Sequence, residues 1–151
     1  MLRLSREADY GLLAMVYIAS QPSGQLAYRR DIAAHYGIPR EFLAKVLQKL
    51  SRRGLVRSFR GMQGGYQLAR DAREITLADV ITAVDGPLSL VDCQCPPYEC
   101  GQEFVCTVKG IMGEVQQDIL KVLGGITLDD MHRRLDSGQA GRLIRVRGSA
   151  R

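Results

Sequence analysis

The feature that most limits how this chain can fold is a glycine turn between two short amphipathic segments. The first covers residues 29–35 and ends at Tyr36-Gly37, where glycine suits the left-handed conformation that closes a helix. The second covers residues 38–54. Its apolar residues repeat at helical spacing and are Phe42, Leu43, Val46, Leu47 and Leu50. Two helices joined this closely are the sequence form of a helix-turn-helix, whose second helix enters the DNA major groove.

A candidate β-hairpin follows directly. Residues 55–59 and 66–69 have the composition of two short strands, and residues 60–65 between them contain three glycines. Glycines let backbone amides approach a phosphate closely, and Arg60 stands where a side chain can enter the adjacent minor groove. Helix, turn, helix and basic hairpin in this order predict a winged helix-turn-helix.

The positive charge of the chain lies in the same region. Residues 1–70 contain twelve Lys and Arg against four Asp and Glu, whereas residues 71–151 contain nine against twelve, for a net charge of +5 overall. A basic half of this kind is what neutralising nucleic-acid phosphates requires, although an anionic membrane surface attracts it too.

Other features argue against a membrane. The charges of Arg3, Arg6, Glu7 and Asp9 interrupt any apolar run that resembles a signal peptide. No stretch approaches the roughly 18 apolar residues that a membrane span needs. We therefore expect a cytoplasmic protein without a membrane partner.

Three further helices are expected, at residues 76–84, 107–123 and 127–135. A long solitary helix is marginal unless its apolar face is covered, so we expect residues 107–123 to dimerise; packing within its own chain is the alternative. The predicted fold is mostly α with a small β-hairpin wing: a winged helix-turn-helix plus a long dimerisation helix. Its predicted parts are a DNA-binding domain at 1–86, a cysteine-rich cluster-binding loop at 87–106, a dimerisation helix and short C-terminal helix at 107–136, and a flexible tail at 137–151.

All four cysteines, Cys93, Cys95, Cys100 and Cys106, fall within fourteen residues. Disulfides are disfavoured in the cytosol, and the spacing lacks the Cys-x-x-Cys pairs or neighbouring His typical of zinc sites. Thiolates select iron–sulfur clusters, zinc or copper(I), and the open loop around Pro96, Pro97 and Gly101 favours an iron–sulfur cluster, either [2Fe–2S] or [4Fe–4S].

Three stretches together resemble the IscR/NsrR family of bacterial winged-helix iron–sulfur transcription regulators. They are LSREADYGLLAMVYIA, DIAAHYGIPREFLAKVLQKLSRRGLVRSFRGMQGGYQLAR and EITLADVITAVDGPLSLVDC followed by spaced cysteines, and the match covers roughly residues 1–135. The resemblance implies a homodimer with crossed long helices, recognition helices in successive major grooves and wings in the minor groove.

The same resemblance implies a ligand set. It assigns Cys93, Cys100 and Cys106 to the cluster, with a fourth ligand that varies between branches. The IscR-like branch has a His where this chain has Lys109, so the nitric-oxide-sensing NsrR branch is the closer one. In that branch an acid directly before Tyr-Gly, here Asp9, reaches the partner subunit's cluster. The alternative for Asp9 is a structural role, because the N-terminus of a helix favours an acidic residue.

Cys95 departs from the family pattern, as do the six residues between Cys93 and Cys100 where five are commoner. Cys95 is therefore a candidate fourth ligand, a replacement for Cys93 or a free oxidisable thiol.

These observations predict a dimeric DNA-binding regulator, a repressor, whose cluster senses nitric oxide or redox state. The alternatives are a regulator responding to cluster or iron supply, and a cysteine-oxidation sensor without a cluster. An enzyme is not expected, because His35 and His132 have no recognisable nucleophile or paired acid nearby. The predicted DNA contacts are Arg29, Pro39, Arg40, Glu41, Lys45, Lys49, Ser58, Arg60, Gly61, Gln63 and Gly64.

Overall fold

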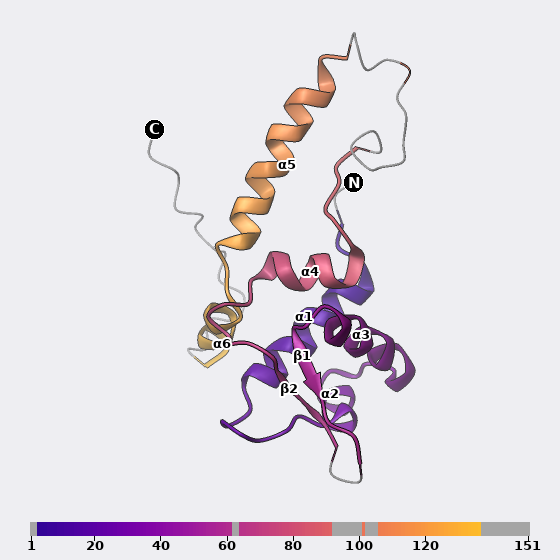
Figure 1. Cartoon of the computed structure of the whole chain (residues 1–151), viewed down its shortest axis with the longest axis vertical. Helices are drawn as coiled ribbons and strands as arrows, with labels where there is room; N and C mark the ends of the chain where they lie inside the picture. The colour runs from indigo at the N-terminus through magenta and orange to yellow at the C-terminus, as the bar shows by residue number, and fades with distance from the viewer. Residues whose placement is uncertain (1–2, 62–63, 92–100, 102–105, 137–151) are drawn as a thin grey trace.

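The computed structural model describes residues 3–61, 64–91, 101 and 106–136, and these form six helices and one hairpin (Figure 1). In chain order the elements are α1 (Arg6–Ala19), α2 (Arg29–Tyr36), α3 (Arg40–Arg52), β1 (Val56–Ser58), β2 (Tyr66–Leu68), α4 (Leu77–Asp85), α5 (Val108–Gly124) and α6 (Leu128–Asp136). The mostly helical fold with a small antiparallel hairpin is confirmed. Every predicted helix is present, and no end differs from its predicted position by more than two residues.

Local hydrogen bonds explain where α1 and α4 begin. The Ser5 hydroxyl accepts a bond from the Ala8 N–H at 3.0 Å and caps α1. At α4 the Thr76 hydroxyl accepts from the Asp79 N–H, and the Asp79 carboxylate accepts from the Thr76 N–H, which is a capping box. α2 ends at Gly37, whose φ of +65° is strained for any residue with a Cβ.

The hairpin is a three-residue antiparallel ladder. Val56 pairs with Leu68, Arg57 with Gln67, and Ser58 with Tyr66. Ala27, just before α2, adds a third backbone partner that the sequence analysis did not predict: it exchanges two hydrogen bonds with Tyr66, of 2.9 and 2.8 Å. These bonds attach the hairpin to the segment that leads into α2.

One hydrophobic core joins α1, α3, α4 and α6. Its largest buried side chains include Met15 of α1, Leu43 and Leu47 of α3, Val80 of α4 and Leu128 of α6. Each buried side chain of this size contributes about 1.5–3 kcal/mol relative to an exposed one. Among the described residues, no polar or charged residue is buried in this core.

α6 packs with the N-terminal domain. The Leu128 N–H bonds to the Ile75 carbonyl at 2.9 Å, and the Leu77 N–H bonds to the Ile126 carbonyl at 2.8 Å. The predicted grouping of this helix with the dimerisation helix, as residues 107–136, stays a prediction. Leu128 of α6 is fully buried, and α6 contacts α1.

α5 is the one described helix without a buried residue, and it extends away from the core (Figure 1). Its exposed apolar side chains are Val108, Ile111, Val115 and Val122, of which Ile111 is 63% exposed. Within the described part of the chain, no helix is both long and apolar enough to cross a membrane.

Candidate nucleic-acid interface

α3 has one apolar and one polar face. Leu43, Val46, Leu47 and Leu50 are buried against α1 and α4. The opposite face is exposed and carries Arg40, Glu41, Lys45, Gln48 and Arg52. The Arg, Lys and Gln side chains offer donors for phosphates and base edges, and the Glu41 carboxylate offers an acceptor for a base edge. Arg40, Glu41 and Lys45 are among the contacts predicted from the sequence.

The amino termini of α2 and α3 both lack a side-chain cap. The Asp31 N–H of α2 bonds to the Tyr28 carbonyl, and no side chain accepts from the other first-turn N–H groups of these two helices; at α1 and α4, in contrast, Ser5 and Thr76 accept such bonds. Beside the turn between α2 and α3 lies a hollow of about 290 Å³, lined in part by Arg30 and Arg40. This arrangement suits a backbone phosphate of DNA.

Arg29 and Pro39, two further predicted contacts, are exposed at these two helix starts. Arg30 was not predicted as a contact. Its place next to Arg29 in the first turn of α2 is the signal that would have found it.

The hairpin presents a second exposed set. Ser58, Arg60 and Gly61 are exposed, Gly64 is half-buried, and Gln63 lies outside the described residues. A Cβ at Gly64 would lie 2.3 Å from the Phe59 carbonyl oxygen, so only glycine fits this turn. Phe59 itself is 46% exposed and was not predicted as a contact.

The side chain of Lys49 is directed toward α1 and α4, unlike the other predicted contacts on α3, and it is 42% exposed. Its ammonium forms an ion pair with Glu7 of α1 and donates a 2.9 Å hydrogen bond to the Val84 carbonyl of α4. An ammonium bonded in this way joins the three helices, and these bonds occupy the charge that a DNA phosphate would need.

The last residue of α4, next to Val84, belongs to the same junction. There the Ser5 hydroxyl bonds to the carboxylate of Asp85, the last residue of α4. α4 and α3 are thus both tied to the start of α1.

The predicted cluster ligands lie mostly outside the described residues, including Cys93, Cys95 and Cys100. Cys106 is half-buried with a free thiol and stands just before α5. Asp9 is exposed in the first turn of α1. In the described part of the chain, no three His, Cys, Asp or Glu side chains are grouped as metal ligands.

The shifted pKa values belong to structural contacts. Hydrogen bonds from Arg73 lower the pKa of the exposed Asp71 carboxyl, and burial together with the nearby Tyr17 raises the pKa of Tyr36. Neither group is part of a catalytic arrangement within the described residues.

A winged helix-turn-helix with an exposed basic face and a projecting helix defines a transcriptional regulator. The chain belongs to the Rrf2 family: residues 4–134 match the family model described as "Iron-dependent Transcriptional regulator". Its named relatives are transcriptional regulators and not enzymes, in agreement with the expectation from the sequence.

A helix-turn-helix-type transcriptional regulator of Mycobacterium tuberculosis is 47% identical over 90 residues, which are 60% of this chain. Those residues span 56% of that regulator's length. The IscR structure from T. potens has a TM-score of 0.71 at 30% identity, covering 95% of this chain and 93% of that one.

The structure of CymR, the global cysteine regulator of B. subtilis, also has a TM-score of 0.71, at 27% identity, covering 88% of this chain and 98% of that one. IscR and CymR thus share this fold equally well.

Proposed function

We propose that this protein binds a palindromic DNA operator as a homodimer, with α3 in the major groove and the hairpin in the minor groove. The observation that carries the proposal is the exposed basic set formed by Arg40, Lys45 and Arg60 beside two uncapped helix starts. Arg29, Pro39, Glu41, Ser58, Gly61, Gln63 and Gly64 complete the proposed contacts.

α5 supplies the proposed dimer contact. Its exposed apolar residues, Val108, Ile111, Val115 and Val122, follow one another at intervals of three, four and seven residues. This is the spacing of a seam between two helices, and a second copy of the same helix provides a matching apolar face. Two-fold pairing would present two α3 helices to two half-sites.

The test of DNA binding is selection of genomic fragments by the purified protein, followed by fluorescence anisotropy on the selected sequence. We expect nanomolar binding that the double variant Arg40→Ala/Lys45→Ala weakens at least tenfold. Failure to enrich any fragment, or equal affinity of the double variant, rejects the proposed interface. Lys121→Ala on α5 serves as the control for loss of a positive charge outside it.

We further propose that an iron–sulfur cluster held by Cys93, Cys100 and Cys106 controls this binding. Asp9 of the partner subunit or Cys95 completes the ligand set. The donor chemistry fits, because soft thiolates hold such clusters and a carboxylate is the weaker, exchangeable ligand. The bound cluster supplies a centre that reacts with nitric oxide or oxidants, as expected of an NsrR-like regulator.

The junction at Lys49 provides a physical link between this segment and α3. α4 ends at Asp85, and the chain then leads into the cysteine-containing segment. Because Lys49 bonds to Val84 and Glu7, a displacement of this end of α4 changes the support of α3. A change in the cluster would thus change the spacing of the two α3 helices in the dimer, and with it the affinity for the operator on which repression depends.

Anaerobic purification tests the cluster directly. We expect brown protein whose iron and sulfide are lost in the triple variant Cys93→Ala/Cys100→Ala/Cys106→Ala, and whose operator affinity falls on addition of nitric oxide. Full iron content in the triple variant rejects these ligands, and unchanged affinity with nitric oxide rejects that signal.

A second candidate function is sensing of iron supply or of cysteine oxidation without a cluster. Two observations support this second candidate. Cys95 adds a thiol that can be oxidised, and the fold is as similar to that of CymR, the global cysteine regulator, as to that of IscR. Colourless protein with reversible disulfides, or cluster loss in low iron without a response to nitric oxide, supports this candidate over nitric oxide sensing.

A further inference from the structure

Phe59, directly after β1, has an unusual environment for an aromatic residue of this protein. Among the Phe and Tyr residues that the structure describes, it is the only exposed one, at 46%. Outside α5, the only other large apolar side chain exposed in the described residues is Leu4, at 45%. A single exposed apolar side chain is common on protein surfaces and needs no partner by itself. The surroundings of Phe59 are therefore what points to a role.

The hairpin backbone fixes the place of Phe59. Its N–H bonds to the Gly65 carbonyl at 2.8 Å, which continues the ladder one step beyond β1 and β2 toward the turn. The Gly64 N–H bonds to the Gly61 carbonyl at 3.0 Å within that turn. Phe59 is thus held on a hydrogen-bonded backbone two residues before Gly61.

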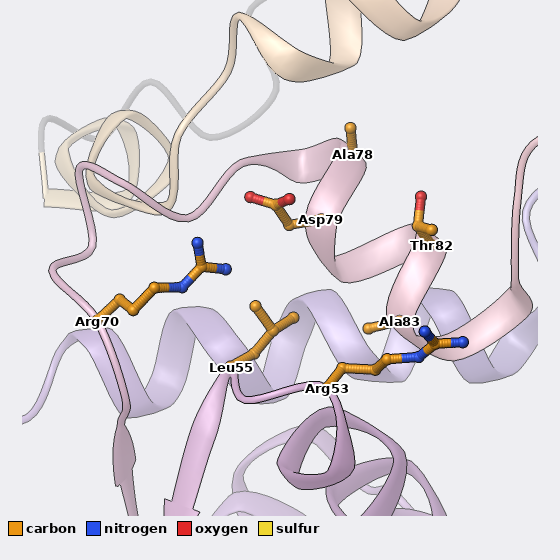
Figure 2. Close-up of a pocket in the computed structure, with 7 residues that line it drawn as sticks. All are labelled: Arg53, Leu55, Arg70, Ala78, Asp79, Thr82 and Ala83. Carbon is orange, nitrogen blue, oxygen red and sulfur yellow. The ribbon is translucent and has the colours of Figure 1, made fainter.

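The base of the hairpin is supported as well. Leu55 is buried there, and Figure 2 shows its side chain between Arg53 and Arg70. Leu55 borders the same hollow as Ala83 of α4. Because the hairpin is held at its base and along its ladder, little conformational freedom is lost when its end contacts a partner.

Exposed positive charges lie on both sides of Phe59 in the sequence. Arg57 and Arg60 are exposed, and in the described part of the chain neither takes part in an ion pair. Since successive residues of a strand face opposite sides, Arg57 and Phe59 share the side opposite to the buried Val56. An apolar ring between two guanidinium groups suits a ligand whose apolar surface is bordered by negative charge. The minor groove of DNA has this character, because phosphates border the sugars that form its walls.

We propose that Phe59 is a further DNA contact, whose ring makes an apolar contact in the minor groove beside Arg60. Proteins that bind this groove combine arginines with apolar side chains such as Phe. The ring adds affinity by removing apolar surface from water, whereas Arg60 adds affinity by neutralising phosphate charge. The inference rests on the proposed function, because it needs the hairpin to enter the groove.

The experiment measures operator affinity of the full chain by fluorescence anisotropy at several sodium chloride concentrations. We expect Phe59→Ala to weaken binding about tenfold at every concentration, with an unchanged slope of log affinity against log salt. Phe59→Leu, which keeps an apolar side chain, should retain most of the affinity. Leu4→Ala is the matched control, because it truncates an equally exposed apolar side chain outside the proposed interface, and it should bind as the wild type does.

Hydroxyl-radical footprinting locates the contact, because these radicals cleave DNA at sugars that are accessible from the minor groove. We expect the wild type to protect sugars at one minor-groove position in each half-site. Phe59→Ala should lose this protection while its thermal unfolding midpoint equals that of the wild type.

Equal operator affinity of Phe59→Ala and the wild type overturns this inference and leaves the proposed function standing. A loss of affinity that comes with a lower unfolding midpoint or a smaller salt slope also overturns it, because Phe59 would then support the hairpin or Arg60 without touching DNA. A wild type that selects no DNA fragment rejects the proposed function and this contact with it.

Discussion

The ammonium of Lys49 on α3 donates a 2.9 Å hydrogen bond to the backbone carbonyl of Val84 on α4. The same ammonium pairs with Glu7, so one side chain joins three helices. Lys49 lies on the helix that carries the exposed Arg40 and Lys45, yet its own ammonium bonds to α1 and α4. Two lysines on one helix therefore have different surroundings.

Replacing Lys49 by Met should destabilise the domain before it affects DNA contacts. The loss includes a charged hydrogen bond and a partly exposed ion pair, for which about 1–2 kcal/mol of unfolding free energy is expected. Urea unfolding measures this change. Lys45→Gln is the matched control: it should keep the unfolding free energy within about 0.5 kcal/mol while weakening operator binding. The reverse pattern in the two variants contradicts the assignment.

Leu128→Ala should test the position of α6 in the core. Leu128 is fully buried, and truncating a buried leucine costs about 2–5 kcal/mol. Val122→Ala is the control, because Val122 is 41% exposed on α5. We expect the first change to lower the unfolding midpoint, and the second to promote dissociation of the dimer in analytical ultracentrifugation. A neutral Leu128→Ala would exclude α6 from the core.

Arg60→Gln should reduce the salt dependence of operator binding. If the side chain neutralises one phosphate, the slope of log affinity against log salt should decrease in magnitude by about 1. Anisotropy titrations between low and moderate sodium chloride measure the slope. Lys121→Gln, remote from the interface and paired with Asp118, should leave it unchanged. An unaltered slope for Arg60→Gln removes Arg60 from the phosphate contacts.

Acid should weaken the start of α6. Hydrogen bonds from the Thr127 N–H and hydroxyl lower the pKa of Asp130 in the folded state. The stability that these hydrogen bonds contribute is fully present above the pKa of Asp in the unfolded chain, about 3.9. It is lost as the pH falls through the lower pKa of Asp130 in the folded protein.

Unfolding free energies at pH 7 and below pH 4 check this expectation. Asp130→Asn should show a smaller loss between the two pH values than the wild type. Asp118→Asn, whose carboxylate is exposed, should behave as the wild type. Parallel curves for Asp130→Asn and wild type would contradict the role of Asp130.

The helix-turn-helix could be predicted because its signals are local. Gly37 interrupts two apolar repeats, and the glycines after Arg60 mark the hairpin turn within a few residues. The exposed face of α3 follows from the same periodicity, since residues opposite a buried stripe face solvent.

Long-range contacts could not be predicted in this way. The two partners of Lys49, Glu7 and Val84, lie 42 and 35 residues away in sequence. The position of Lys49 along α3 therefore does not indicate which residues its side chain contacts. The burial of Leu128 likewise depends on where the chain returns after α5. The bridge between Ala27 and Tyr66 requires a segment whose sequence has no strand pattern.

The backbone pairing of Ile75 with Leu128 and of Leu77 with Ile126 has a consequence for how such proteins diversify. The chain leaves the folded domain after α4 and rejoins it beside the residues that precede α4. These two backbone contacts join the segments before and after α5 directly and do not require a fixed length of chain between them. Selection can therefore lengthen, shorten or exchange the intervening chain while this pairing stays intact, so one architecture can acquire new input signals without rebuilding its output.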